Sequence, residues 1–530
     1  MRCYLTIHTE SELCVSDGGE IWDADTALDR FGIPVLRGGR LRGLLRAACE
    51  ELVMLGAADM SEVQTLFGSP DMPGLLTVQD AHPAGYPQQL AALQEGRITA
   101  QMILEKDTVV RVCSGFDENG TASRIRMVRA VRRGMTFLGV CDCPEEQLPL
   151  LQRALPLLRR MGLGRTRGMG KVTCRMADPA EIAWIMPESD PFPADAGAAV
   201  FTLDLLSPLA ADEAIPGSML RGAWRERIGT AADGLHFSFA HPEADGMAAL
   251  PVPGFLAAPK RSAFSGDPPQ RQLFAPDLTN AADDPSVIPL RSGLLAADAA
   301  FTELRMPVLH RGILIRHEQD APGRPAHFFR IRTLSEGQRL TGRIGGDPAL
   351  LQAVADSLRK DPLISLGRGR HAGLGLCRMA LQPLPEMPSC VTDTAAVWLG
   401  SPAVLLDDNA MYQCRPELFR FYLELLLPPG IRIAQELDRW VRYADIAPRH
   451  PVCPAFRAYA GGTVFLYRFT SAFDLAGLAG RRIGEMTADG FGEFRMIPAD
   501  RLNRASFTAV QTISAIPVCA PYLREEEKHA

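Results

Sequence analysis

The sequence predicts an α+β protein made of tandem ferredoxin-like modules, with a smaller module of the same kind at its C-terminal end. Three observations predict this class: a glycine- and arginine-rich element recurs along the chain, an Ile-Pro element precedes a helical pattern twice, and a glycine-led strand lies between them. A repeated unit indicates repeated domains. At 530 residues the chain also exceeds one core, and about 100–200 residues per domain suggests three.

The first module is expected at residues 1–178. MRCYLTIHTE alternates like a strand, and IPVLRGGRLRGLLR (33–46) opens a helix whose leucines follow i, i+3, i+4 spacing. GMTFLGV (134–140) is expected to be a strand, and residues 150–161 a second helix. LGRTRGMGKVTCRM (163–176) then predicts a glycine turn that leads into a last strand. Helices against a sheet that begins and ends the module give a ferredoxin-like outline.

The second module is expected at 198–381 and the third at 391–530. IPGSMLRGAWR (215–225), GQRLTGRI (337–344) and LGRGRHAGLGLCRM (366–379) repeat the three elements in the same order. The third module keeps only the glycine element, IGEMTADGFGEFRM (483–496), without an Ile-Pro partner. The Pro-rich stretches 178–197 and 381–390 are typical of linkers.

Composition excludes several classes of protein. A net charge of −6 and a pI near 6.0 argue against phosphate binding over the whole surface, so a basic surface must be local. We expect a cytoplasmic protein, because neither a signal peptide nor an apolar run of about 18–20 residues is visible. The twelve cysteines include no CxxC pair and are expected to be free thiols, and no motif predicts a bound cofactor or metal.

The repeated elements predict a phosphate site. Glycines permit positive φ, successive backbone N–H groups in such turns bind anions, and helix N-termini do so as well. The alternative is a glycine-rich hairpin with solvated arginines, in which Pro34 and Pro216 only set a turn. The candidate RNA-binding residues are Gly38, Gly39, Arg40, Arg42 and Arg46; Gly164, Arg165, Arg167, Gly168, Gly170 and Lys171; Gly217, Ser218 and Arg221; and Gly367, Arg368, Arg370, Gly373 and Gly375.

The Ile-Pro-Gly-Ser-x-Leu-Arg-Gly helix start, paired with a C-terminal glycine turn, resembles the RAMP proteins of CRISPR systems, which are RRM-like modules that bind guide RNA. D-A-D…D-x-x-G-I-P (23–34), the stretches 236–260 and 310–344, and SPAVLLDDNAMY (401–412) are similar to the large two-RAMP subunit of type III-D effectors. The resemblance implies guide RNA, target RNA, and other RAMP and large subunits as partners. The chain departs from the pattern at V-L-R-G-G-R (35–40) and in the third module, which lacks the helix start.

The resemblance also implies a catalytic role. In RAMP proteins that cleave target RNA, an aspartate before the Ile-Pro turn lies at the scissile phosphate; Asp25 matches best, beside Asp23 and Asp29. Such an endoribonuclease would act on guide-paired target RNA and could use a divalent cation. The alternative is an Asx turn that caps the loop.

Two other functions are compatible with the sequence. A guide-processing ribonuclease would use a histidine as its base, and a pure protein scaffold would need no catalytic group. The aromatic content of 7% favours RNA over a protein interface, whose centre is typically aromatic. The histidine candidates are His8, His310 and His317, near Arg311 and Arg316, and the candidates for base stacking are Phe328 and Phe329.

Overall fold

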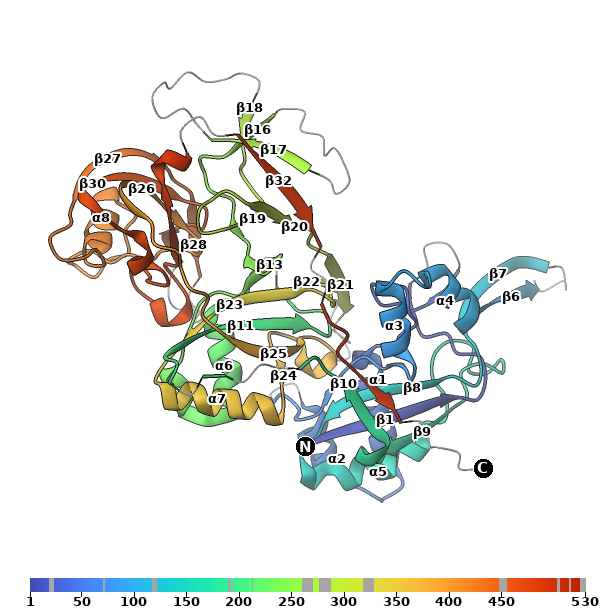
Figure 1. Cartoon of the computed structure of the whole chain (residues 1–530). Coiled ribbons are helices and arrows are strands. Elements are labelled where there is room, and N and C mark those ends of the chain that lie inside the picture. Colours follow the sequence, from blue (N-terminus) through green and yellow to red (C-terminus); the bar gives the residue numbers. More distant parts are fainter. Residues whose placement is uncertain are drawn as a thin grey trace.

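The computed structural model contains mostly strands with some helices, so the α+β class is confirmed. It describes residues 1–18, 23–69, 72–116, 122–188, 192–193, 195–211, 213–259, 270–275, 287–317, 328–447, 455–502, 506–513 and 516–524. Figure 1 shows three units, each built on its own sheet. Among these residues, no helix combines the length and the hydropathy that a bilayer span needs.

The first module forms an antiparallel sheet with strand order β4-β8-β1-β9, in which β5 also pairs with β8. The central strand β1 therefore contacts β8 on one side and the last strand β9 on the other. Its main elements are β1 (Arg2–Thr9), β2 (Ser16–Gly18), β3 (Asp25–Thr26), α1 (Gly38–Met54), α2 (Met60–Phe67), β4 (Thr77–Val78), β5 (His82–Pro83), α3 (Tyr86–Gln94), α4 (Ala100–Asp107), β6 (Thr108–Phe116), β7 (Ala122–Val131), β8 (Thr136–Asp142), α5 (Leu148–Ala154) and β9 (Val172–Ala177).

Helix α1 has the buried face that the leucine spacing predicted, with Leu41, Leu45 and Leu52 in the core. It lacks a local side-chain cap, and the carboxylate of Asp80 accepts the Gly38 N–H at 2.7 Å instead. The second helix is shorter than expected: α5 passes into a 3-10 turn that ends at Leu157. The chain must leave the helix there because Arg160 already pairs with Lys171 across the glycine turn.

The second module repeats this connectivity. Its sheet has the order β14-β13-β23-β11-β25-β24, with β12 also on β23, so the first strand again lies between the third and the last. The buried Asp204 of β11 binds Arg339 at 2.6 Å and Arg378 at 3.2 Å inside the module. The elements are β11 (Ala198–Leu205), α6 (Gly217–Ile228), β12 (His236–Phe237), β13 (His241–Ala244), β14 (Met247–Ala248), β21 (Arg311–His317), β22 (Phe328–Leu334), β23 (Arg339–Gly345), α7 (Pro348–Lys360), β24 (Leu363–Ser365) and β25 (Leu376–Pro383).

The third module has the sheet order β27-β30-β26-β31, which is the same arrangement. A 3-10 turn, Leu475–Leu478, stands where the other modules have their second helix. The elements are β26 (Val391–Leu399), α8 (Pro416–Glu424), β27 (Ile433–Trp440), β28 (Tyr443–Ile446), β29 (Phe456–Tyr459), β30 (Val464–Asp474) and β31 (Phe494–Pro498).

A further sheet joins segments far apart in the sequence. An insertion in the second module supplies β15 (Leu250–Pro251), β16 (Ala257–Pro259), β17 (Gln270–Phe274), β18 (Val287–Pro289), β19 (Leu294–Ala297) and β20 (Leu304–Pro307), and β32 (Ser506–Thr512) inserts between β20 and β17. The chain then returns to the first module, where β33 (Ala520–Leu523) pairs with β10 (Ile182–Ile185), a strand within the stretch expected to be a linker (Figure 1).

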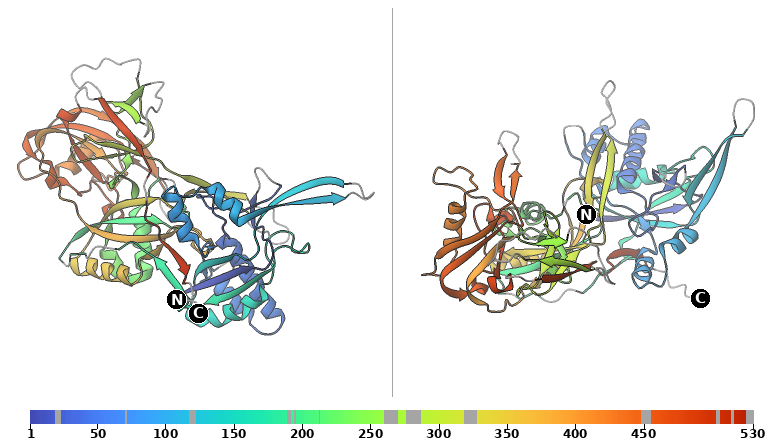
Figure 2. Two further views of the ribbon diagram at one scale, coloured as in Figure 1. Left: turned by 45° about the vertical axis from the view of Figure 1, so that its right-hand side comes forward. Right: turned by 90° about the horizontal axis from the view of Figure 1, so that it is seen from above.

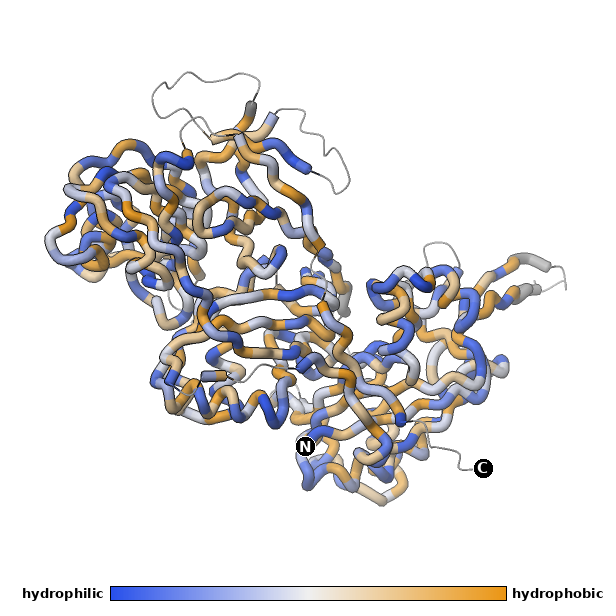
Figure 3. Tube along the Cα trace, viewed as in Figure 1, coloured by the Kyte–Doolittle hydropathy of each residue, from blue (hydrophilic) through white to orange (hydrophobic). Residues whose placement is uncertain are grey.

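Each module also carries a two-stranded hairpin between its second and third sheet strands. These hairpins are β6–β7, β21–β22 and β28–β29. Figure 2 shows β6–β7 extending well away from the body of the first module. In every module the fourth residue after the first strand bridges to the last residue of the hairpin: Leu13 to Val131, Leu209 to Leu334 and Ala403 to Tyr459. Figure 3 shows hydrophobic residues along the sheets and also along the β6–β7 hairpin.

Candidate nucleic-acid interface

The three glycine turns share one backbone conformation. Their positive-φ positions have the same spacing: 162, 164, 168 and 170; 367, 369, 373 and 375; 484, 486, 490 and 492. In the first two turns all are glycines with φ between +67° and +86°, and in the third Met486 replaces one glycine at φ +55°. Residues other than glycine rarely adopt this region, so the glycine spacing fixes the turn.

The same hydrogen bonds close each turn. Met161, Leu366 and Ile483 donate their N–H groups to the last glycine of their turns at 2.8–2.9 Å. Those last glycines donate to Glu12, Pro208 and Pro402, which follow the first strand of each module. A Cβ on the last glycine would lie only 1.8–2.1 Å from the carbonyl oxygen of the residue before the turn. The repeat inferred from sequence is therefore a structural repeat.

The second glycine turn packs on the helix start of the first module. A Cβ on Gly373 would lie 2.7 Å from the Asp80 Oδ1 atom and 3.4 Å from the Gly38 Cα atom. Asp80 also accepts a hydrogen bond from Arg37 at 2.9 Å, so its carboxylate binds both the helix start and the residue before it. Beyond the turn, the Arg30 N–H donates to Glu336 at 2.9 Å. Two modules thus meet at a tight, charged contact.

The third glycine turn packs on the helix start of the second module in the same way. A Cβ on Gly490 would lie 2.6 Å from the Phe239 N atom, and one on Gly217 would lie 2.7 Å from the Asp489 O atom. Asp489 pairs with Arg221 of α6 at 2.6 Å. The turn of one module therefore docks on the glycine-led helix of the module before it, twice in this chain.

The first glycine turn is open. Nothing among the described residues lies within 4 Å of a Cβ built on Gly168, and residues 165–168 are exposed. Neither Arg165 nor Arg167 has a carboxylate within 4 Å in the described part of the chain, whereas Arg370, which stands at the place of Arg165, pairs with Glu226 at 2.5 Å. Residue 47 stands at the place of Glu226 and is alanine, so the first module has no partner for Arg165 there. These two arginines therefore leave cationic groups free at the surface.

Comparison with known proteins finds a family match in the first module, which is called the RAMP module from here on. Residues 6–173 match the RAMP superfamily. No curated protein matches the sequence. A chain of the type III-B Cmr-beta complex bound to cognate target RNA is 11% identical and covers 33% of this chain and 97% of its own, with a TM-score of 0.28. A chain of the apo Cmr-beta complex is 11% identical and covers 34% and 98%, also with a TM-score of 0.28. Neither similarity is high enough to support a conclusion.

The remaining candidate RNA-binding residues differ in their exposure and in the groups that they contact. Arg40 is exposed and donates to the Ser16 carbonyl at 3.3 Å. Arg42 is partly buried and donates to the Leu76 carbonyl at 3.2 Å, while burial lowers its pKa. Arg46 pairs with Glu50 at 2.9 Å. Arg42 and Arg46 therefore serve the fold of the RAMP module. Gly39, Arg368 and Lys171 lie at or near the surface, and Ser218 lies beside Gly217 at the second junction.

The aspartates of the RAMP module each have a structural partner. Asp23 accepts the Met127 N–H at 2.7 Å, and Asp25 pairs with Arg129 at 3.4 Å. Both contacts fix the loop to the hairpin strand β7. Burial raises the pKa of Asp25. Asp29 is buried and accepts the N–H groups of residues 31 and 33 at 2.9 and 2.8 Å, as an Asx turn does, and burial raises its pKa to about 7. Among the described residues, no group of three side chains could hold a metal ion.

The β6–β7 hairpin was not predicted from the sequence; it carries Arg126, and Arg133 lies in the turn that follows β7. Arg126 and Arg133 are exposed, and no carboxylate of the described residues lies within 4 Å of them. Val112 and Ile125 of the same hairpin are 64% and 63% exposed. The alternation of apolar and basic residues over 108–131 could have predicted a two-sided ribbon.

The histidine candidates lie apart. The His8 Nδ1 atom lies 3.0 Å from the hydroxyl of Thr136, its exposed cross-strand neighbour where β1 pairs with β8. His310 lies in the second module, where its backbone N–H donates to Gln338 at 2.9 Å and burial lowers its pKa. Arg311 pairs with Glu213 at 2.7 Å. The side chains of His317, Arg316, Phe328 and Phe329 lie outside the described residues. The described histidines therefore form no cluster.

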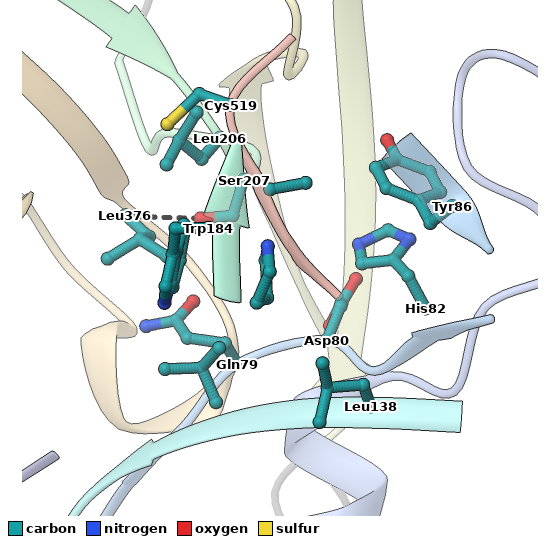
Figure 4. A pocket seen from close by; sticks show the side chains of 13 residues that line it. Gln79, Asp80, His82, Tyr86, Leu138, Trp184, Leu206, Ser207, Leu376 and Cys519 are labelled. Carbon is teal, nitrogen blue, oxygen red and sulfur yellow. Dashed lines mark hydrogen bonds between the residues drawn. The ribbon is translucent and has the colours of Figure 1, made fainter. Parts of the chain in front are cut away.

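A cavity of about 50 Å³ lies where the RAMP module meets the second module, and the C-terminal strand covers it. Figure 4 shows His82 and Tyr86 on one side and Trp184, Leu206 and Cys519 on the other. Burial lowers the pKa of His82 to about 3, so its imidazole is neutral near pH 7. This volume suits bound water rather than a substrate.

Proposed function

We propose that this chain is a structural, guide-RNA-binding subunit of a type III CRISPR effector complex, with tandem RAMP modules organised like the large two-RAMP subunit of type III-D systems. The observation that supports it most directly is that the module matching the RAMP superfamily exposes arginines on its glycine turn, on its hairpin and just after the hairpin, with no carboxylate of the described residues within 4 Å. The second and third modules repeat its sheet order and its glycine turn, which supports modules of the same kind throughout.

RNA contact is proposed at the exposed arginines of the RAMP module. Arg126 on the hairpin, Arg133 in the turn that follows it and Arg165 on the first glycine turn each offer a guanidinium that can bind phosphate oxygens in a bidentate way. The exposed Val112 and Ile125 give the same hairpin an apolar surface that suits unstacked bases. The net charge of −6 is compatible with this proposal because these cationic groups are local.

Binding, rather than cleavage, is the activity that we propose. Asp23, Asp25 and Asp29 are each engaged by a backbone N–H or by Arg129, which supports a structural role for the loop. A carboxylate that activates a nucleophile must reach the scissile phosphate with an accessible oxygen, whereas the Asp25 Oδ1 and Asp29 Oδ2 atoms are buried.

The salt dependence of RNA binding tests the proposal. Single-stranded RNA affinity should fall with salt, with a slope of about −0.7 on a log-log plot for each phosphate contact. The variant Arg126→Ala/Arg133→Ala should reduce that slope by about 1.4, because two contacts are removed. The matched control is Arg97→Ala/Arg359→Ala, which removes the same charge from two exposed arginines that are paired with Glu95 and Asp356.

A second measurement addresses the identity of the RNA. The chain is co-expressed with its genomic neighbours and purified, and the bound RNA is sequenced. Short RNAs that share one 5′ handle support the proposal, and fewer should bind to Arg165→Ala. If no RNA binds to the wild type or to any variant, the proposed function is wrong and a protein scaffold is the better account.

A further inference from the structure

One docking contact, between a glycine turn and a glycine-led helix start, occurs twice in the chain. The first glycine turn makes no such contact among the described residues. We propose that the first glycine turn, residues 162–170, docks on the glycine-led helix start of a different subunit of the RAMP type, in the geometry that joins the modules of this chain. The inference relies on the proposed function only for the class of the partner. The contact itself is argued from the two junctions within the chain.

The third glycine of a turn makes the contact in both junctions. Gly373 leaves room for Asp80 and Gly38 of the first module, since a Cβ would lie 2.7 Å from the carboxylate. Gly490 leaves room for the segment between β12 and β13 of the second module, since a Cβ would lie 2.6 Å from the Phe239 N atom. The close neighbour is backbone at Gly490 and the Asp80 carboxylate at Gly373, so a side chain at this position would push against the adjoining module in both junctions.

The first turn has the same shape but no neighbour among the described residues. Gly168 occupies the third position with φ +82°, close to the +86° of Gly373 and the +89° of Gly490. A Cβ there would meet open space. Leu163, beside the turn, is 44% exposed, and such an apolar side chain favours a covered surface. The turn is therefore already in the docked conformation, which lowers the entropic cost of binding.

A second copy of this chain is not the partner. Its two glycine-led helix starts, at Gly38 and Gly217, are already covered by its own second and third turns. The helix of the third module, α8, follows Arg415 and begins with Pro416, so it has no glycine at its start. The occupant must be another chain whose glycine-led helix start is free.

The charge at the junctions specifies that chain further. At the second junction Asp489, one residue before Gly490, pairs with Arg221, which lies four residues after the helix-start glycine Gly217. In the first turn the residue before Gly168 is Arg167, so the charge is reversed. The partner should therefore carry an aspartate or glutamate four residues after its helix-start glycine.

The test uses the full chain and the RAMP-superfamily proteins encoded beside it, each purified alone. Biolayer interferometry compares the wild type with Gly168→Asn, because asparagine tolerates positive φ but adds a side chain at the contact. The matched control is Gly430→Asn in the third module, where φ is +86° and a Cβ would also meet open space. Thermal melting of both variants checks that the fold is intact.

We expect one neighbour to bind the wild type and Gly430→Asn equally, and Gly168→Asn at least tenfold more weakly. Arg167→Glu should weaken binding, and exchange of the partner's acidic residue for arginine should restore it. A benzophenone amino acid at Thr166 should cross-link to the first turn of the partner's helix. In the absence of the partner, sedimentation should show a monomer.

Three results would overturn the inference: equal binding of Gly168→Asn and wild type, cross-links from Thr166 to RNA alone or to a protein site away from a helix start, or self-association that Gly168→Asn abolishes. RNA affinity is measured in parallel. Loss of RNA binding with intact docking would reject the proposed function and leave this inference standing, and the reverse pattern would do the opposite.

Discussion

The exchange of a single glycine for alanine in two equivalent turns measures what holds the modules together. Gly373 and Gly168 occupy the same position with φ of +86° and +82°. Alanine in this backbone conformation costs about 1–2 kcal/mol at either site. At Gly168 that is the whole effect, because a Cβ meets nothing among the described residues within 4 Å.

At Gly373 the same Cβ would lie 2.7 Å from the Asp80 carboxylate. That carboxylate accepts hydrogen bonds from the Gly38 N–H at 2.7 Å and from Arg37 at 2.9 Å. Displacement of the carboxylate weakens charge-assisted bonds that are worth about 1.5–3 kcal/mol. We therefore expect Gly373→Ala to lower the free energy of unfolding by about 1.5–3 kcal/mol more than Gly168→Ala does.

Guanidinium unfolding, followed by circular dichroism and by tryptophan fluorescence, gives both free energies. A double-mutant cycle with Asp80→Ala isolates the contact, because the extra cost of Gly373→Ala should shrink when the opposing carboxylate is gone. Equal destabilisation by Gly373→Ala and Gly168→Ala, or an extra cost that persists without Asp80, would refute the argument that this turn docks on the helix start.

Three more predictions concern charged groups. Burial raises the pKa of Asp29 to about 7 in the folded chain, above its ordinary value of about 3.9. Its contribution to the free energy of unfolding is therefore full below about pH 4 and is lost as the pH rises to about 7. In denaturant titrations between about pH 5 and 7.5, Asp29→Asn should remove this fall of the free energy of unfolding with pH. Asp204→Ala leaves two arginines without their carboxylate and should cost about 3–5 kcal/mol, seen as a lower melting temperature; an unchanged melting temperature would contradict this. A double-mutant cycle on Arg221 and Asp489, which are partly exposed, should give a coupling of about 1 kcal/mol that weakens in high salt, and a coupling of zero would remove this pair from the junction.

Local patterns predicted the helix α1 and the glycine turns, since leucine spacing and glycines at fixed intervals act within one segment. The partners of the turns could not be predicted, because Asp80 and Gly373 lie far apart in the sequence and meet only when two modules pack. The return of β32 into a sheet of the second module has no local signal either. The same holds for β10, whose four residues lie in a Pro-rich stretch and pair with the C-terminal β33.

The site was predicted least well where a residue's role depends on its neighbours. Arg42 and Arg221 occupy equivalent places in the two helix starts, yet Arg42 binds carbonyl groups of its own module whereas Arg221 binds Asp489 of the next. The sequence contains both arginines in the same motif, and only the packed modules distinguish them.

The third turn gives a reason to look outside the chain for the role of Gly168. Met486 stands at the second positive-φ position with φ +55°, so this turn tolerates a residue other than glycine where no neighbouring module presses on it. Its side chain is 41% exposed. At the third position, glycine is favoured in two turns by close atoms of the adjoining module: the Asp80 carboxylate at Gly373 and the Phe239 backbone at Gly490. Gly168 has the same φ and no such neighbour among the described residues, so the contact that would exclude a side chain there belongs to another molecule.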